Sequence, residues 1–285
     1  MSKRKRARVS RSRAGDLLVF LLLAVFGCFT AIPFLFSLVQ SIKPMNELFI
    51  YPPRLTVNSP TADNFAVLFQ LTGNTWVPLT RYLFNSLALT LLGTVGNVLI
   101  CSAAAYPLAK LRFHGRTVLF ELVVVSLLFT YEVTAIPNYV ILARLHLLDT
   151  FWALLLPALA TPMGLFLMKQ FMEQIPDPII ESARVDGAGI LTVYGRIVMP
   201  QVKPAWLTLT IFSFQALWNR EGLEYIFSEE LKMFPTILKQ VASAGAARAG
   251  AAAAAAVILM IPPVLVFLVS QSNVLETMAS SGIKE

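Results

Sequence analysis

The sequence predicts an all-α membrane protein, a polytopic bundle of about six transmembrane helices with a short cytoplasmic helix between the fourth and the fifth. Two observations support this prediction. Only 14% of the 285 residues are charged and 56% are hydrophobic, whereas about 25% of the residues in a soluble domain are charged. Long apolar runs also recur along the chain, and a bilayer core about 30 Å thick takes about 20 helical residues to cross.

A basic tail, 1–16, opens the chain and leads directly into the first apolar run. It contains Lys3, Arg4, Lys5, Arg6, Arg8, Arg11 and Arg13. Such a tail can bind nucleic acid or anionic lipid, but the uncharged run 17–39 follows at once, and basic residues beside a span mark its cytoplasmic side. We therefore predict a cytoplasmic tail and no nucleic-acid partner. The run is also too long for a signal peptide, whose apolar region is about 7–15 residues.

Five further apolar segments complete the predicted transmembrane domain, 17–271, and leave a C-terminal tail, 272–285. They are 83–109, 118–140, 151–168, a short segment from Ala205 to Asn219, and 249–270. We expect Pro137 to interrupt the third helix. Because the fifth segment is short, the charged residues that follow it must face water, protein or a cavity; they are Arg220, Glu221 and Glu224.

Loop charges orient this bundle. With the N-terminus inside, the outer segments are 40–82, 141–150 and 219–250, and they carry as many Lys and Arg residues as the inner segments without the tail. The basic tail therefore decides the orientation, and both termini are predicted to be cytoplasmic. The Ala- and Gly-rich stretch from Ala242 to Ala256 is expected to lead into the last helix and form its outer half, since alanine favours helix and small residues allow close helix packing.

The sequence predicts no catalytic or metal centre. Cys28 and Cys101 lie inside apolar runs, so we expect small buried side chains and no disulfide. His114 and His146 fall in separate loops. The chain contains no G-x-x-x-x-G-K-[ST] phosphate loop and no G-x-S-x-G nucleophile motif. It is therefore predicted to be a non-catalytic subunit with no cofactor of its own.

The longest predicted cytoplasmic loop, 174–200, reads as two short helices joined by a glycine elbow. Asp177 is expected to cap a helix that has Pro178 at its first position. Gly187 is expected to end this helix in the left-handed conformation. A second short helix, 190–198, should follow. Glu181 and Arg184, three residues apart, are placed to form an ion pair on the first helix.

The run Glu181-Ser-Ala-Arg-Val-Asp186-Gly187-Ala188, with Pro200 downstream to stop the second helix, resembles the EAA loop of binding-protein-dependent ABC importer permeases. Ser182 stands where the family pattern has alanine, and a small residue is kept. Further segments, in the same order along the chain, are similar to carbohydrate permeases of the kind of the smaller maltose-permease subunit. They are Ser41-Ile-Lys43, Asn85-Ser86, Ala105 to Phe113, Ile136-Pro137, Phe166 to Phe171, and Trp218-Asn219.

The resemblance implies a multi-pass permease subunit of a bacterial inner membrane that imports a sugar or oligosaccharide delivered by an extracellular binding protein. It implies a second permease subunit, in a heterodimer, and two cytoplasmic ATPase subunits that hold ATP and Mg. The loop 174–200 would dock on an ATPase subunit and couple ATPase closure to the transmembrane helices. The residues expected to do so are Glu181, Ala183, Asp186, Gly187, Ala188 and Gly189.

Polar side chains inside the predicted spans are candidates for the substrate pathway. They are Glu132, Asn138, Gln215, Trp218 and Asn219. Each has a structural alternative, which is helix–helix hydrogen bonding or, for the tryptophan, anchoring at the membrane interface. Two alternatives to an importer subunit also stand. A stand-alone secondary transporter would need an ion relay and internal repeats, and an intramembrane enzyme would need a nucleophile and base; the sequence reveals neither.

Overall fold

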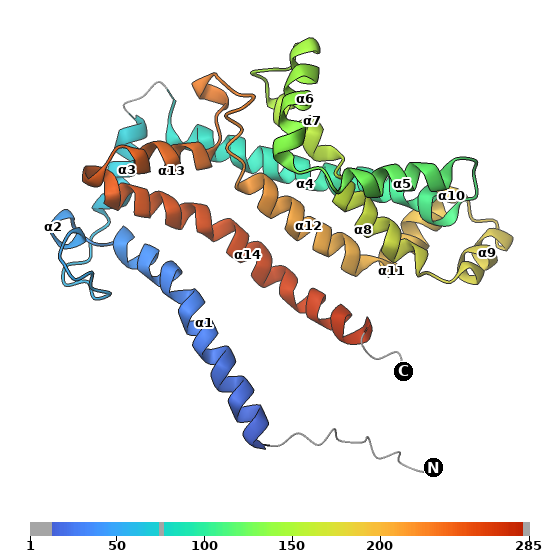
Figure 1. The fold of residues 1–285 in the computed structure, drawn as a ribbon, viewed down its shortest axis with the longest axis horizontal. Helices are drawn as coiled ribbons and strands as arrows, with labels where there is room; N and C mark the ends of the chain where they lie inside the picture. Colours follow the sequence, from blue (N-terminus) through green and yellow to red (C-terminus); the bar gives the residue numbers. More distant parts are fainter. Residues whose placement is uncertain (1–12, 74–76, 282–285) are drawn as a thin grey trace.

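The computed structural model describes residues 13–73 and 77–281, and every regular element within them is a helix. This agrees with the all-α prediction. Most of the long helices extend along the length of the molecule, with short helices at both ends, and the first helix diverges from the others (Figure 1). The first twelve residues of the basic tail and the last four residues of the chain lie outside the described part. The predicted C-terminal tail from 272 is helical as far as Ser281.

The helix α4 (Leu79–Lys110) forms the centre of the bundle and packs against α7 (Phe151–Leu159), α8 (Pro162–Glu173) and α12 (Lys203–Trp218). Two glycines make this packing close, because a Cβ on Gly93 would lie 2.5 Å from Leu217 and one on Gly96 would lie 2.3 Å from Leu159. Small residues allow membrane helices to approach in this way. The sequence from 83 to 109 therefore builds the scaffold on which the other helices are placed.

A buried asparagine joins the same helices through hydrogen bonds. The Asn97 amide donates to the carbonyl oxygen of Ala158 over 2.9 Å, and its side-chain oxygen accepts from the Ser213 hydroxyl over 2.9 Å. The amide also donates to the Thr161 hydroxyl over 3.0 Å. In a membrane, such a satisfied polar group holds helices together, and here it fixes α4 to α7 and α12.

The first helix, α1 (Arg13–Ser41), leaves this centre and packs against α14 (Ala249–Ser281). Figure 1 shows the two helices close at one end and divergent toward the chain termini. None of the apolar window of α1 is buried within the chain. Cys28, expected to be buried, is accordingly exposed on α1, while Cys101 is buried in α4 and both thiols are free. An apolar helix can place Cys28 against lipid or another subunit.

The structure moves the limits of the predicted spans. Within the described residues, four helical stretches are long and apolar enough to cross a membrane, and a bent pair makes up to five. The bent pair is α5 (Arg116–Ser126) and α6 (Tyr131–Arg144), which meet at 111°. The break therefore lies at 127–130, where N–H groups bond only three residues back. Pro137, expected to interrupt this span, lies inside α6.

Two other predicted limits also move. The fourth span extends to Glu173, and α12 has only 16 residues, in keeping with the short fifth segment.

The stretch from Ala242 does not enter the last helix continuously. Instead, α13 (Phe234–Ser243) ends, Gly245 has a φ of +89°, and a 3-10 turn (η3, Ala246–Arg248) precedes α14. Ala251, Ala254 and Ala255 are buried against neighbouring helices, as small residues in a helix contact should be.

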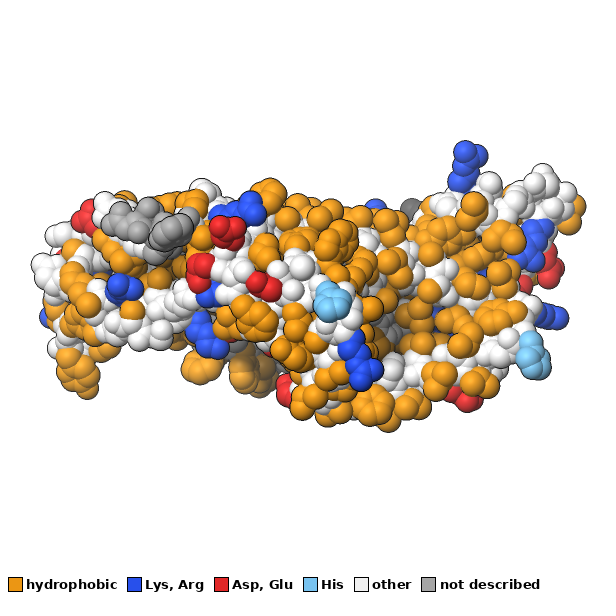
Figure 2. All heavy atoms as spheres, turned by 90° about the horizontal axis from the view of Figure 1, so that it is seen from above, with side chains coloured by type: hydrophobic (Ala, Val, Ile, Leu, Met, Phe, Trp, Pro, Cys, Tyr) orange, Lys and Arg blue, Asp and Glu red, His pale blue; other side chains and the backbone are white. Residues whose placement is uncertain are grey.

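Short elements cap the two ends of the bundle. At one end lie α2 (Met45–Leu48), α3 (Asp63–Gly73), α13 and a 3-10 turn (η2, Glu229–Leu231). At the other end lie α9 (Asp177–Val185), α10 (Ile190–Thr192), a π-helix (η1, Val193–Val198) and α11 (Met199–Gln201). Apolar side chains dominate the face seen in Figure 2, and charged side chains gather at the end that carries α9 and in a second group nearer the other end.

Candidate functional site

The loop 174–200 folds as the predicted helix and glycine elbow. The helix α9 ends at Val185, and Gly187 has a φ of +84°. The N–H of Gly187 donates to the carbonyl of Arg184 over 3.0 Å, and that of Ala188 donates to the carbonyl of Ala183 over 2.9 Å. This pair of bonds is a Schellman motif, which needs a left-handed residue at the position of Gly187. The prediction of its conformation is confirmed.

The start of α9 differs from the expectation in one respect. The helix begins at Asp177, but no side chain caps it, and Pro176 takes the capping position. The Asp177 carboxylate instead accepts a hydrogen bond from the Lys110 ammonium over 2.6 Å. This ammonium holds the pKa of Asp177 below its usual value. Because Lys110 is the last residue of α4, the contact ties the short helix to the central membrane helix.

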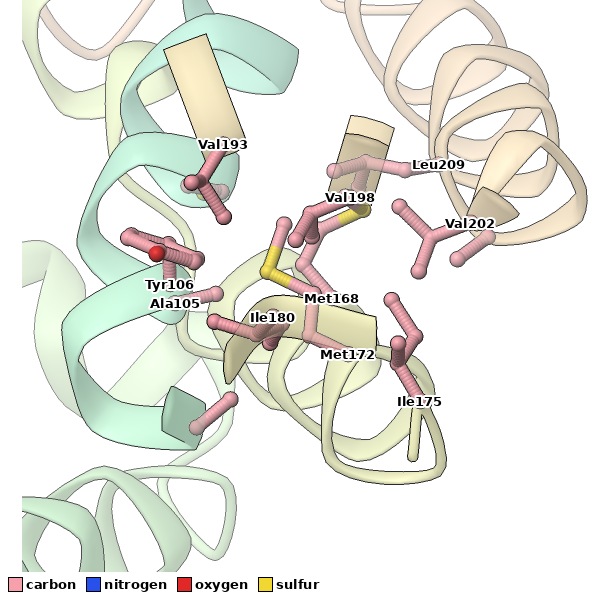
Figure 3. Packing of buried hydrophobic residues seen from close by; sticks show 13 residues of the cluster. Ala105, Tyr106, Met168, Met172, Ile175, Ile180, Val193, Val198, Val202 and Leu209 are labelled. Carbon is pink, nitrogen blue, oxygen red and sulfur yellow. The ribbon is translucent and has the colours of Figure 1, made fainter. Parts of the chain in front are cut away.

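One face of the elbow is built into a core that connects it to the bundle. Ile180 of α9 is buried in a cluster with Ala105 and Tyr106 of α4, Met168 and Met172 of α8, and Leu209 of α12 (Figure 3). Burying a side chain of this size contributes about 1.5–3 kcal/mol. Ala183 and Ala188 pack on the edge of the same cluster. Their small size thus serves packing within the chain, and their contact with an ATPase subunit stays a prediction.

A π-helix that was not predicted from the sequence links the elbow to α12. In η1 both Val193 and Val198 are fully buried, and Tyr194 shares a 2.7 Å hydrogen bond with Ser102 of α4. Pro200 does not stop the helical path as predicted, because α11 continues to Gln201 and α12 begins at Lys203. Short π segments often occur at functional sites. The elbow is therefore joined to α12 by almost uninterrupted helical backbone.

The opposite face of the elbow is exposed and carries both charge and apolar surface. Glu181, Asp186, Gly187 and Gly189 are exposed. Val185 and Leu191 are 88% and 83% exposed. They were not predicted as site residues, although an apolar residue on each side of the elbow is visible in the sequence. The expected pair of Glu181 with Arg184 does not form, since the ion pairs of the described residues do not include it. These charges are thus available to a partner.

The structure does not bring the five candidate pathway residues together. Trp218 is buried, stacks on Phe214, and donates its indole N–H to the carbonyl of Leu259 over 2.7 Å. This hydrogen bond joins α12 to α14, so Trp218 has the structural role that was the alternative to a place in the substrate pathway. Gln215 and Asn219 line a largely apolar groove of about 530 Å³ between α1, α12 and α14.

Glu132 and Asn138 lie elsewhere, on α6, which Figure 1 shows projecting away from α14. Their role as pathway residues stays a prediction. Beside them, an Arg–Glu–Tyr cluster joins the base of α6 to the end of α12. Arg220 donates to Glu224 over 2.9 Å and to the Tyr131 hydroxyl over 3.2 Å, and Tyr131 also bonds Glu224. The charged residues beyond the fifth segment therefore face protein, as one of the expectations stated.

Comparison with known proteins identifies the family. Residues 96–278 match the model of the binding-protein-dependent transport system inner membrane component. The chain belongs to this family. It is therefore a membrane component of a binding-protein-dependent transport system, as the resemblance of the loop implied. The matched region contains the elbow, its core and the helices α5–α12 in full.

Individual relatives cover almost the whole chain. The putative ABC transporter permease protein ORF2 of Caldicellulosiruptor is 30% identical over 93% of this chain and 96% of its own length. The arabinooligosaccharides transport system permease protein AraQ of Bacillus subtilis is 28% identical over 94% of this chain and 94% of its own length. A chain of a bacterial ABC transporter that imports the acidic polysaccharide alginate shares the fold, with a TM-score of 0.77, 21% identity, and coverage of 92% of this chain and 98% of that one.

Proposed function

We propose that this chain is one of two permease subunits of an ATP-driven importer for a sugar or oligosaccharide, coupled to separate ATPase subunits through the loop 174–200. The observation that carries the proposal is the elbow itself. Its outward face is free for a partner, while its inward face packs on α4, α8 and α12 in one core. A force on the elbow therefore reaches three helices through close-packed side chains, which transmit strain.

The choice of a sugar rests on the relatives. AraQ is named as a permease for arabinooligosaccharides, and the alginate importer carries a polysaccharide. A second relative, UgpE of Yersinia enterocolitica, is named for sn-glycerol-3-phosphate and is 28% identical over 92% of this chain and 95% of its own length. A related alginate structure contains a periplasmic protein bound to an alginate pentasaccharide, which supports a binding protein as the donor of substrate here. ATP and Mg would be held on the ATPase subunits.

The orientation proposed for the importer places both termini and the elbow in the cytoplasm of a bacterial cell. The start of α1 and the end of α14 both lie away from the end of the bundle that carries α2 and α3 (Figure 1), which supports this topology. The basic tail before α1 follows the rule that positive residues stay inside. The binding protein would then dock on the opposite end, which carries α2, α3 and α13.

Reconstitution tests the proposal. This chain, a second permease and two ATPase subunits are placed in vesicles with ATP on the ATPase side and the loaded binding protein on the other. We expect sugar uptake to need both ATP and the binding protein, and ATPase turnover to rise when the loaded protein is added, because a ligand shifts a conformational equilibrium only through different affinities for its states. Uptake driven by a proton or sodium gradient without ATP would instead assign the chain to the secondary transporters.

A further inference from the structure

The loop 49–55 presents an apolar tip next to the outer end of α1. It reads Phe49-Ile-Tyr-Pro-Pro-Arg-Leu55. Tyr51 is 91% exposed, and Phe49 and Leu55 are each more than half exposed. Large apolar side chains exposed in succession mark a contact with a protein or a membrane.

Hydrogen bonds at the base of this loop hold it in shape. Lys43 is buried, and its ammonium donates to the carbonyl of Arg54, which closes the loop across its neck. The Glu47 carboxylate accepts the N–H groups of Asn58 and Ser59, each over 3.1 Å. The tip is therefore presented by a fixed frame. An ordered tip loses less conformational entropy on binding than a flexible tip would.

The frame holds the tip beside the membrane helices. Phe49 lines a groove together with Phe36 and Gln40 of α1 and with Ala249 and Ala253 of α14. Figure 1 shows the loop curling beside the end of α1. Phe49 thus lies level with the last outer turns of two spans, where the hydrocarbon of a bilayer gives way to its headgroups.

The composition of the tip fits that boundary. Aromatic side chains concentrate at the two membrane interfaces, where an apolar ring and a polar group are both accommodated. Arg54 is exposed, and it forms no ion pair with any residue that the structure describes. A cation at this depth attracts lipid phosphate. We propose that the loop 49–55 is an interfacial anchor that inserts Phe49, Ile50 and Tyr51 into the outer leaflet, with Arg54 at the phosphate level.

Spin-label accessibility tests this anchor in the assembled transporter. Single cysteines replace Tyr51 or Asn58 in a background carrying Cys28→Ala and Cys101→Ala, and the labelled complex is placed in phospholipid nanodiscs without binding protein. Asn58 is the matched control, because it is an exposed polar residue of the same framed segment, and its backbone N–H is bonded to Glu47. We expect the label at 51 to collide readily with oxygen, which dissolves in lipid, and poorly with a water-soluble nickel chelate. The label at 58 should show the reverse.

Each other pattern overturns the proposal. Equal nickel accessibility at 51 and 58 would place the tip in water. Low accessibility to both oxygen and nickel at 51 would place it against the second permease, and protection that appears only when the binding protein is added would make it a protein docking surface. The anchor rests on the proposed orientation of the bundle and not on the transport of a sugar, and these measurements need no ATP or sugar. A failed uptake assay would leave them intact.

Discussion

At the scale of single residues, the elbow offers a matched pair of glycines. Gly187 has a φ of +84°, Gly189 has a φ of −69°, and a Cβ on either would meet open space. The left-handed conformation costs a non-glycine residue about 1–2 kcal/mol, which changes a two-state population by roughly 5–30-fold. We therefore expect Gly187→Ala to lower the ATPase stimulation by loaded binding protein, and Gly189→Ala to have a smaller effect, because a φ of −69° suits alanine. The reconstituted complex provides the measurement; equal effects of the two variants would remove the elbow from the coupling mechanism.

A second residue, Asp149, organises the loop that follows α12. Its carboxylate accepts the N–H of Phe227 over 2.9 Å and that of Ser228 over 2.8 Å, and it also bonds the Ser228 hydroxyl. These bonds, with that from the Ser228 hydroxyl first, lower the pKa of Asp149. Its φ of +56° is left-handed, a conformation that asparagine tolerates and alanine resists.

We expect Asp149→Asn to speed hydrogen exchange at the amides of Phe227 and Ser228 at neutral pH, and Asp149→Ala to speed it further. In the parent protein the protection should be complete at any pH above about 3.9, the usual pKa of aspartate. It should be lost as pH falls further, through the lowered pKa of the folded state, because protonation removes the charged acceptor. Exchange in Asp149→Asn equal to the parent rate would show that the carboxylate does not hold this loop.

At the scale of elements, α12 connects the core beneath the elbow to α14. At its inner end, Ala205 and Leu209 are buried in the core beneath the elbow. At its outer end, the indole N–H of Trp218 donates a hydrogen bond to a carbonyl of α14. Trp218→Phe removes this one hydrogen bond, which contributes about 0.5–1.5 kcal/mol, and keeps an aromatic ring beside Phe214. We expect a lower melting temperature of the permease with an unchanged sugar concentration for half-maximal uptake. Unchanged stability of the variant together with impaired uptake would indicate that Trp218 belongs to the substrate pathway.

At the scale of the whole molecule, the topology can be tested by labelling. Asn58 and Ser182 are both exposed and lie at opposite ends of the bundle. In the cysteine-free background, Asn58→Cys should react with a membrane-impermeant maleimide in intact cells, and Ser182→Cys should react only after the membrane is opened. Reaction of both residues in intact cells would refute the proposed arrangement, with the elbow in the cytoplasm.

Much of this architecture could be predicted from the local sequence. The run Asp177-Pro178 to Gly187 specifies a short helix and its left-handed end, because the constraint on each residue comes from its own backbone. The break between α5 and α6 was not accessible in the same way. Pro137 was expected to interrupt this span, but the chain turns at 127–130, a stretch that contains no glycine or proline. The turn depends instead on contacts that fix α6 to the end of α12, through Tyr131, Arg220 and Glu224.

The sequence by itself determined that the chain is an all-helical membrane protein, that it has the loop of a permease family, and that a glycine elbow lies in that loop, since hydropathy and backbone preferences are properties of short segments. Only the tertiary structure decided which face of the elbow is free. Ala183 and Ala188 turn inward and Val185 and Leu191 turn outward, because Ile180 is drawn into a core made by α4, α8 and α12. Such a core joins residues far apart in the chain, so no single segment encodes it.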